Sequence, residues 1–286
     1  MRIEMTSEPG DPGRPNEDYA SAALPSSGQG GAVVVLDGVT PPPEDVGCAH
    51  GVPWFTARLG GAMLELSGSR RDLELTGCLA AAIARTADAH RSTCDLSHIR
   101  TPQATVVAVR WGEESVEHLV LSDSALLLER ADGAVDPVLD PRLGELPEHL
   151  RALRQRVRAL PRDTPERTAA RAEYARAVEA LRNAADGDGF YTAAADPTVA
   201  NRAVTGSTPR ADLRALLALT DGAARWTETF RLGGWAELFA LVRKEGTGTL
   251  VARVREAEAT DPDGTRYPRG KARDDATAVF AAVGSH

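Results

Sequence analysis

Long apolar runs, an excess of positive charge and clustered cysteines are all missing from this chain of 286 residues. No apolar run approaches the ~20 residues of a membrane-spanning helix, so we expect no membrane partner. The formal net charge of −8 argues against nucleic acid as a partner, because nucleic acids are bound largely through cationic contacts to phosphates. The segment "MRIEMTSEPGDPGRPNEDYA" lacks the apolar core of a secretory signal, so we expect none.

Cysteine and histidine are also scarce, with three and six residues respectively. Cys48, Cys78 and Cys94 lie far apart and form no Cys-x-x-Cys pair, which favours reduced thiols and a cytoplasmic protein over a disulfide framework. Because His-x-x-x-His spacing is missing too, the sequence argues against a zinc site. It also contains neither a Walker-type phosphate loop nor a serine hydrolase motif, which argues against those two kinds of chemistry.

Apolar periodicity indicates an α+β fold with a substantial core, since 42% of the residues are hydrophobic. The runs "ATVVAVRW" and "VEHLVLSDSALLLE" are separated by "GEES", a hairpin pattern that makes at least part of the sheet antiparallel. No repeat or long linker divides the chain, so we expect a single domain over residues 1–286. Further strands are expected over residues 31–36, 189–196, 200–207, 213–222 and 276–283, and helices over 54–66, 73–93, 234–244 and 248–259.

The composition changes between residues 145 and 185, where Arg, Ala, Leu and Glu dominate. Pro161 and Pro165 divide this segment into two amphipathic helices. Its charged residues are interpreted as solvated helix faces, and a surface that faces a phosphorylated substrate is the alternative. We therefore expect a helical insertion, or flap, at about 145–185 within the single domain.

Carboxylates recur at the ends of apolar segments. Asp37-Gly38 follows "VVVL", and Asp221-Gly222 follows "LLALT". Either pair alone is explained by a turn, but the two together favour strands that deliver carboxylates to a functional site. The other acidic residues in comparable positions are Glu17 and Asp18 in "RPNEDYA", Asp123 at an expected bend or bulge in "LVLSDSALLL", and Asp274 in "ARDDATAVF".

Carboxylates flanked by apolar residues are costly to bury unless they are paired or bind a metal. No run of Lys or Arg stands beside these positions, so their clustering in space would favour a divalent cation. Ligands that offer only oxygen suit Mg²⁺ or Mn²⁺. Gly38 fits such a site, because its carbonyl can turn toward an ion that the neighbouring carboxylate also binds. Taken one at a time, the acidic residues can equally be turn formers or helix N-caps.

The order of these segments resembles the PPM family of metal-dependent protein phosphatases, the PP2C-like serine/threonine phosphatases, of bacterial type. "GRPNED" is similar to the opening Arg…Asn-Glu-Asp motif of that family, and "VVVLDG" to its first Asp-Gly. "LVLSDSALLL" is similar to its Gly-Asp-Ser-Arg hairpin, "LLALTDG" to its late Asp-Gly, and "RDDATAVF" to its closing strand. The matches follow the family order from Gly13 to Phe280 and so cover nearly the whole chain.

The resemblance implies a PP2C-like four-layer α-β-β-α sandwich of two mostly antiparallel sheets flanked by helices. It also implies two Mn²⁺ or Mg²⁺ ions between the sheets. The residues that it assigns to the metals are Glu17, Asp18, Asp37, Gly38, Asp123, Asp221 and Asp274.

The resemblance gives these residues separate roles. Asp37 would bridge the two ions, and the Gly38 carbonyl would hold one of them. Asp221 and Asp274 would hold the other ion, while the acidic pair of "NED" would orient metal-bound waters. Arg14 would clamp the substrate phosphate, although it stands one residue closer to the acidic pair than in common bacterial members.

Several features of the family are missing from this sequence. Val39 stands where some members have a histidine general acid, and His50 in "CAHGVPW" is the nearest candidate substitute, with a packing or capping role as the alternative. Ala125 replaces the arginine of the hairpin motif. Arg225 replaces an aspartate four residues after the late Asp-Gly, which argues against a complete third metal site.

We therefore expect a metal-dependent phosphomonoesterase that acts on phosphoserine or phosphothreonine in a protein partner, with a small phosphomonoester as the alternative substrate. Metal-activated water attacks phosphorus in such enzymes, so no protein nucleophile is needed. A pseudophosphatase that serves as a regulatory binding module is the second interpretation, favoured by Val39, Ala125 and Arg225. Retention of the three main carboxylate ligands argues against it.

Overall fold

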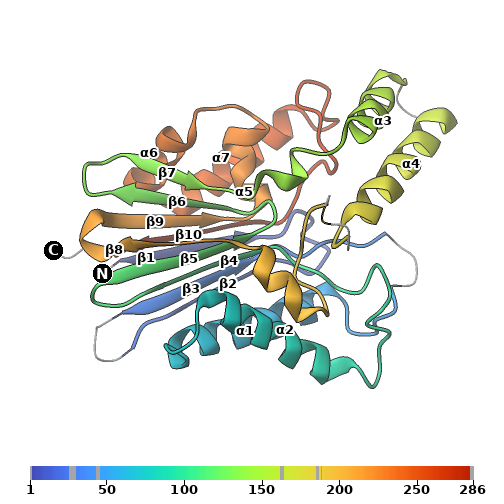
Figure 1. The fold of residues 1–286 in the computed structure, drawn as a ribbon. Helices are drawn as coiled ribbons and strands as arrows, with labels where there is room; N and C mark the ends of the chain where they lie inside the picture. Colours follow the sequence, from blue (N-terminus) through green and yellow to red (C-terminus); the bar gives the residue numbers. More distant parts are fainter. Residues whose placement is uncertain are drawn as a thin grey trace.

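The structure, a computed structural model, describes residues 2–25, 30–42, 46–161, 164–184, 187 and 189–283. Two antiparallel five-stranded sheets pack face to face at its centre (Figure 1). One sheet has the strand order β1-β10-β9-β6-β7, and the other has the order β2-β3-β4-β5-β8. The strands are β1 Ile3–Glu8, β2 Tyr19–Ala23, β3 Gly31–Leu36, β4 Val106–Trp111, β5 Ser115–Leu121, β6 Ala125–Arg130, β7 Val135–Val138, β8 Val204–Pro209, β9 Leu213–Leu219 and β10 Ala276–Ala282.

Helices cover the outer face of each sheet, which confirms the expected four-layer α-β-β-α sandwich (Figure 1). Two helices pack on the β2–β8 sheet and three on the β1–β7 sheet, while α3 and α4 form a separate hairpin beyond one end of the sandwich. None of the described helices is both long and apolar enough to cross a membrane. The helices are α1 Val52–Ser69, α2 Leu75–His90, α3 Glu148–Ala159, α4 Pro165–Leu181, α5 Asp221–Glu228, α6 Trp235–Glu245 and α7 Thr247–Thr260.

The apolar run of β3 is explained by its two buried faces. Val33 and Val35 point into the layer between the two sheets, whereas Val34 and Leu36 pack against α1 and α2. Successive side chains of a strand point to opposite faces, so a strand covered on both sides is apolar throughout. The same burial brings the chain to Asp37 at a fixed position, directly after the last residue of the strand.

Asp123 lies in a crossover between the two sheets, and the expected bend within one continuous strand is therefore wrong. β5 ends at Leu121 in one sheet, and β6 begins at Ala125 in the other. Ser122 adopts a positive φ of 70°, which turns the chain sharply between them. The segments before and after Asp123 are both apolar, because β5 and β6 both bury side chains in the layer between the two sheets. In the sequence they therefore resemble one continuous strand.

Three other expectations need correction. Residues 189–196 form no strand, because they make only two isolated bridges, Phe190 with Arg182 and Ala193 with Ala104. The first part of the strand expected over residues 200–207 is helical, and β8 begins at Val204. β1 and β2 were not predicted, since they are edge strands whose sequences lack an apolar run. Within the expected insertion, α3 and α4 are separated near Pro161 and Pro165 as predicted, and residue 185 lies outside the described residues.

Candidate metal centre

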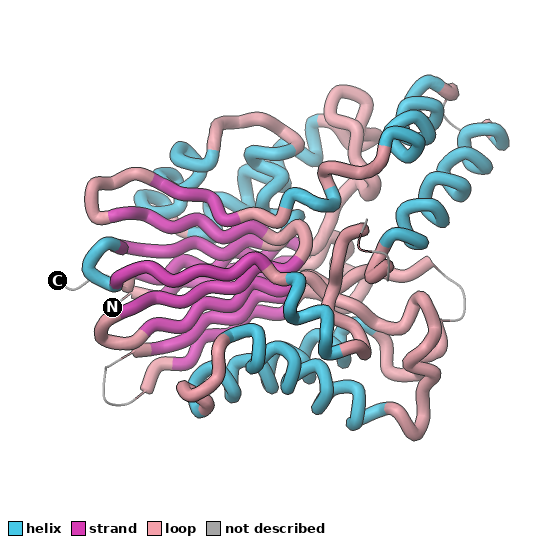
Figure 2. The backbone as a smooth tube through the Cα atoms, viewed as in Figure 1, coloured by secondary structure: helices cyan, strands magenta, loops and turns pink. Residues whose placement is uncertain are grey.

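The two Asp-Gly pairs meet at one end of the sandwich. Asp37 follows β3 of one sheet, and Asp221 follows β9 of the other as the first residue of α5. The backbone N–H of Asp221 donates a hydrogen bond to Asp37 Oδ2 at 3.3 Å. The loops at this end of the sheets lie beside the α3–α4 hairpin (Figure 2). The pairing of two strand ends that the sequence suggested is therefore present in the fold.

Both glycines of these pairs are required by close backbone contacts. A Cβ on Gly38 would lie 2.5 Å from the carbonyl oxygen of Glu17 and 2.4 Å from Val52. A Cβ on Gly222 would lie 1.9 Å from the carbonyl oxygen of Asp275. Each glycine thus lets a second acidic segment approach the aspartate that precedes it. The Asp-Gly pairs are explained by crowding around a shared site and not only by turn formation.

Asp18 is held by hydroxyl groups and keeps one oxygen unpaired. Thr220 Oγ1 and Thr277 Oγ1 donate to Asp18 Oδ2 at 2.9 and 2.7 Å. Both threonines are fully buried, Thr277 within β10 of the opposite sheet and Thr220 directly after β9 of the same sheet. Asp18 Oδ1 is buried and has no hydrogen-bond partner among the residues that the structure describes. A carboxylate oxygen in this condition is costly unless a cation binds it.

Asp275 anchors the N-terminal acidic segment. Its Oδ1 accepts a hydrogen bond from the Gly10 N–H at 2.8 Å, and its Oδ2 accepts one from the Glu17 N–H at 2.7 Å. The Glu17 side chain in turn accepts a hydrogen bond from Thr40 Oγ1. Asp275 therefore positions Glu17, while its neighbour Asp274 faces the other acidic residues.

Asp274 is contacted by two cations. Arg225 Nη2 donates to Asp274 Oδ2 at 2.8 Å, and Lys271 Nζ donates to Asp274 Oδ1 at 2.7 Å. Arg225 is buried and also donates to Glu258 Oε1 at 2.7 Å. Lys271 additionally donates to Thr40 Oγ1 at 2.9 Å. Neither Lys271 nor the contact made by Arg225 was identified from the sequence, because nothing in the linear pattern links them to Asp274.

Asp123 completes the acidic group from the crossover between the sheets. Ser122 Oγ donates to Asp123 Oδ1 at 3.2 Å, and the Ser122 N–H donates to Asp140 Oδ2 at 2.9 Å. Burial raises the pKa of Asp123, and the positive charge of Arg182 opposes that rise. Arg182 follows α4, so the insertion contributes a cation to the edge of the acidic group.

The electrostatics of this group fit a bound cation. Burial, followed by the negative charges of Asp221 and Asp18, raises the pKa of Asp37 well above its usual value. Burial also raises the pKa of Asp18 to about 8 and that of Asp221 to about 7. Carboxylates that repel one another at such short range are stabilised by a divalent ion with oxygen ligands. The donor set therefore fits Mg²⁺ or Mn²⁺, with Asp37, Gly38 and Asp221 at its centre.

A cavity of about 280 Å³ opens onto this group. It is lined by four of the predicted metal-site carboxylates, Asp37, Asp123, Asp221 and Asp274, together with Gly38. Lys271, Arg182 and Arg225 also line it.

Two predicted catalytic residues do not line this cavity. Arg14 is exposed. Burial raises the pKa of Glu17, and the positive charges of Lys271 and Arg14 oppose that rise, so Arg14 stands close to the acidic segment. His50 belongs to a different cluster, where its Nδ1 lies 3.3 Å from Cys94 Sγ. The structure thus gathers the carboxylates and Gly38 but does not bring His50 to them.

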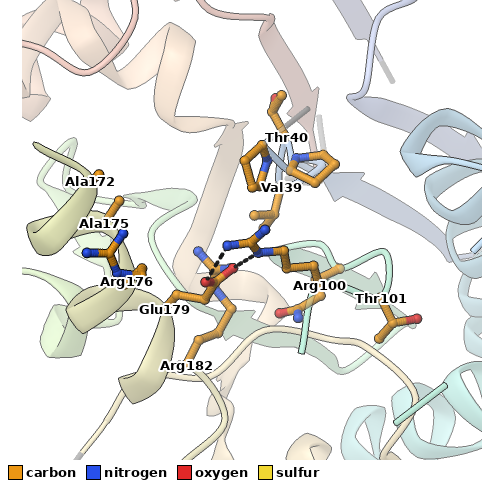
Figure 3. A pocket seen from close by; sticks show the side chains of 12 residues that line it. Val39, Thr40, Arg100, Thr101, Ala172, Ala175, Arg176, Glu179 and Arg182 are labelled. Carbon is orange, nitrogen blue, oxygen red and sulfur yellow. Dashed lines mark hydrogen bonds and ion pairs between the residues drawn. The ribbon is translucent and has the colours of Figure 1, made fainter. Parts of the chain in front are cut away.

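A larger cavity of about 570 Å³ adjoins the first and shares Val39, Thr40 and Arg182 with it. One wall is the loop after Gly38, and the facing wall is α4 (Figure 3). Arg100, from the segment between α2 and β4, donates hydrogen bonds from its Nε and Nη2 to Glu179 of α4 at 2.7 and 3.2 Å. The insertion therefore forms part of a pocket beside the candidate metal centre.

An α-β-β-α sandwich with carboxylates at the ends of strands from both sheets defines the class of metal-dependent phosphatases. The family model of protein phosphatase 2C matches residues 11–251. The chain belongs to the protein phosphatase 2C family, and it is a metal-dependent phosphatase. A search of curated proteins found no similar sequence.

Solved structures show the same fold at low sequence identity. A bacterial serine phosphatase is 14% identical with a TM-score of 0.57, and the match covers 100% of this chain and 99% of that one. The serine/threonine phosphatase Stp1 from Staphylococcus aureus is 14% identical with a TM-score of 0.56, covering 99% and 95%. The catalytic domain of the phosphatase PstP, solved with two manganese ions, is 14% identical with a TM-score of 0.54, covering 99% and 98%.

Proposed function

We propose that this chain is a protein serine/threonine phosphatase with a binuclear Mn²⁺ or Mg²⁺ centre. Asp37 and the Gly38 carbonyl would hold the ions from one sheet, and Asp221 and Asp274 would hold them from the other. The observation that carries the proposal is the meeting of Asp37 and Asp221 from opposite sheets, with the pKa of each raised by burial and by like charges. PstP, which shares the fold, was solved with two manganese ions, and this supports the choice of metal.

The chain's own residues bind the phosphate and position water. If two ions bind at Asp37, Gly38, Asp221 and Asp274, they would supply the water nucleophile by lowering the pKa of that water. Glu17 and Asp18 accept hydrogen bonds from water and so orient it, Asp18 through its unpaired Oδ1. Lys271 lines the cavity that contains Asp37 and offers a positive charge to the phosphate, together with Arg14 at the adjoining surface. These cations offset charge that develops in the transition state.

The substrate of the proposed enzyme is a protein that carries phosphoserine or phosphothreonine. The larger cavity between α4 and the loop after Gly38 offers room for residues that flank the phosphorylated side chain. Stp1 and PstP are described as serine/threonine phosphatases, which supports this substrate class over a small phosphomonoester.

Hydrolysis assays on wild type and Asp37→Asn test the proposal. p-Nitrophenyl phosphate and a phosphothreonine peptide are used as substrates without added metal, with Mg²⁺ and with Mn²⁺. We expect metal-dependent turnover in wild type and a loss of at least about 10²-fold in the variant, because the bridging ligand is gone. Asp132→Asn is the matched control, since Asp132 also precedes glycine but lies exposed in the turn after β6. Full activity of Asp37→Asn would falsify the assignment.

A binding module with weak turnover is the second candidate function. The observation that favours it is the pair of contacts from Arg225 and Lys271 to the two oxygens of Asp274, which compete with a metal for this ligand. Binding of Mn²⁺ by calorimetry with no hydrolysis of either substrate would support this function over the first.

A further inference from the structure

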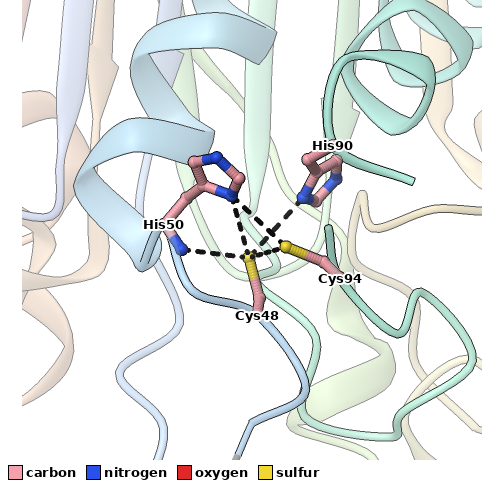
Figure 4. Close-up of side chains that lie close together, drawn as sticks. All are labelled: Cys48, His50, His90 and Cys94. Atoms are coloured by element: carbon pink, nitrogen blue, oxygen red, sulfur yellow. Dashed lines mark hydrogen bonds between the residues drawn. The ribbon is translucent and has the colours of Figure 1, made fainter. Parts of the chain in front are cut away.

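Four potential metal ligands lie close together where the chain enters α1 and where it leaves α2. Cys48 and His50 precede α1, His90 is the last residue of α2, and Cys94 lies one turn further along the chain. Their ligand atoms all lie within 4.8 Å of one another (Figure 4). The sequence did not predict this group, because the two pairs stand 40 residues apart and neither has the spacing that was sought.

The distances within this Cys48–His50–His90–Cys94 cluster are within about 0.5 Å of the edges of a tetrahedron around zinc. Zn–S bonds of about 2.3 Å and Zn–N bonds of about 2.0–2.1 Å place two sulfurs about 3.8 Å apart and sulfur and nitrogen about 3.5 Å apart. Here the two Sγ atoms are 3.3 Å apart. Nδ1 of His90 lies 3.5 Å from Cys48 Sγ, and Nδ1 of His50 lies 3.3 and 3.8 Å from the two sulfurs.

A disulfide does not explain the cluster. Its S–S bond would be about 2.0 Å long, and it would need no histidine beside it. Cys48 and Cys94 are free thiols, and each is approached by an imidazole Nδ1. The His50 N–H also donates to Cys48 Sγ at 3.5 Å, a contact that stabilises a thiolate. Two sulfurs and two nitrogens directed at one point are the ligand set of a closed zinc site.

Neighbouring groups fix the two imidazole rings. Trp54 stacks on His50 with ring centroids 4.3 Å apart, and it lies 5.0 Å from the ring of His90. His90 is only 2% exposed, so its orientation is set by packing. The backbone N–H of Asp95 donates to the Gly47 carbonyl at 2.7 Å, which ties the two ligand-bearing segments together.

We propose that Cys48, His50, His90 and Cys94 bind one zinc ion in a structural site. Four protein ligands leave no open position, so the site holds the fold and does not activate water. His50 is then a zinc ligand and not a general acid. The site is separate from the Asp37 centre in both position and ligand chemistry, because its ligands are sulfur and nitrogen.

The zinc site stabilises one wall of the larger cavity. The chain runs from Gly38 through Val39 and Thr40 toward Cys48, and from Cys94 through Arg100 and Gln103 toward β4. Val39, Thr40, Arg100 and Gln103 line the cavity, and the Val39 N–H donates to the Gln103 carbonyl at 2.9 Å. The proposed ion therefore anchors Cys94 six residues before Arg100, and the hydrogen bond between Val39 and Gln103 connects that segment to the loop after Gly38.

Metal analysis of the full-length protein, purified under reducing conditions without chelator, tests the site. We expect one zinc per chain in wild type and in Asp37→Asn, and none in Cys48→Ser with Cys94→Ser. Cys78→Ala is the matched control and keeps its zinc, because Cys78 is the third cysteine and lies in the core on α2, outside the cluster. If Asp37→Asn keeps its zinc, the zinc is bound independently of the proposed phosphatase centre.

Cobalt substitution of the wild type keeps the test independent of variants that fail to fold. Co²⁺ in a tetrahedral site with two thiolates gives intense visible d–d bands and a near-ultraviolet thiolate charge-transfer band, whereas Co²⁺ at a carboxylate site gives weak absorption. The proposal is overturned if reduced, folded wild type contains no zinc and shows no thiolate band with Co²⁺. Recovery of Cys48 and Cys94 as a disulfide that, once reduced, still binds no metal would also overturn it.

Discussion

Arg225 donates a hydrogen bond to Asp274 Oδ2 at 2.8 Å and places a buried guanidinium directly beside a predicted metal ligand. The same side chain reaches Glu258 of α7, so it joins α5, α7 and the segment before β10. Where family members often carry an aspartate, this chain thus has a cation that both stabilises the fold and competes with metal for Asp274.

Arg225→Met is expected to separate these two effects. Breaking the buried pairs with Asp274 and Glu258 lowers the free energy of unfolding by about 3 kcal/mol. The Mn²⁺ concentration for half-maximal activity falls by about tenfold, because a hydrogen bond to a charged group is worth about 1.5–3 kcal/mol and Asp274 no longer makes it. Denaturant unfolding and metal titration of the hydrolysis rate measure the two quantities. Arg253→Met, on the exposed face of α7, is the control, and unchanged metal dependence in Arg225→Met would contradict competition.

Lys271→Ala and Arg14→Ala compare the two cations available to the substrate phosphate. With saturating Mn²⁺ we expect Lys271→Ala to raise KM for p-nitrophenyl phosphate by about tenfold, because Lys271 lines the cavity. Arg14→Ala has a smaller effect, because Arg14 is exposed and does not line it. Steady-state kinetics of both variants measure the two KM values. A larger increase in KM for Arg14→Ala than for Lys271→Ala would show that Arg14 is the main phosphate ligand.

The acidic group makes stability depend on pH when no Mg²⁺ or Mn²⁺ is added. The pKa values of Asp18 and Asp221 are raised in the folded protein from 3.8 to about 8 and about 7. The folded state therefore binds more protons than the unfolded state in this window, so stability falls as pH rises from about 4 to about 8. Urea unfolding at pH 5, 6.5 and 8 measures the slope. We expect Asp18→Asn to reduce the dependence of the free energy of unfolding on pH, and added Mn²⁺ to raise that free energy most at pH 8. If Asp18→Asn keeps the pH dependence of wild type, Asp18 is not its cause.

We expect the α4 residues that line the larger cavity to contact protein substrates but not small phosphomonoesters. Arg176 lines this cavity, but it does not line the one that opens onto the carboxylates. Arg176→Ala should lower kcat/KM for a phosphothreonine peptide by about fivefold through loss of a polar contact, while leaving hydrolysis of p-nitrophenyl phosphate unchanged. Parallel assays on both substrates test this, and an equal loss on both would place Arg176 in the chemistry instead.

The sandwich was implied by the family resemblance, whereas its central strands could be predicted from the sequence because they are buried on both faces. β3, β4, β9 and β10 all appear in the sequence as apolar runs, and the structure brings the carboxylates beside β3, β9 and β10 together at one cavity. The edge strand β1 could not be found in this way, because its side chains alternate between partial burial and exposure. The crossover at Asp123 was hidden because both flanking strands face the same apolar layer.

The contacts around the acidic group depend on tertiary structure and were not visible in the sequence. Lys271 stands three residues before Asp274, a spacing that in a loop carries no information about contact. The Cys48–His50–His90–Cys94 cluster was missed for a related reason: its pairs, Cys-x-His and His-x-x-x-Cys, are brought together only by the packing of α1 against α2. The only signal in the sequence is that each pair combines one cysteine and one histidine at short spacing.

The division of the acidic group between the sheets has a consequence for folding and unfolding. Asp37 follows a strand of one sheet, whereas Asp221 and Asp274 flank strands of the other. A folding intermediate with only one sheet formed cannot assemble the complete proposed centre, so we expect tight ion binding only after the two sheets have packed together. Conversely, the sheets cannot separate during unfolding without breaking the proposed centre. The rate of ion release in denaturant would therefore measure the rate at which the two sheets separate.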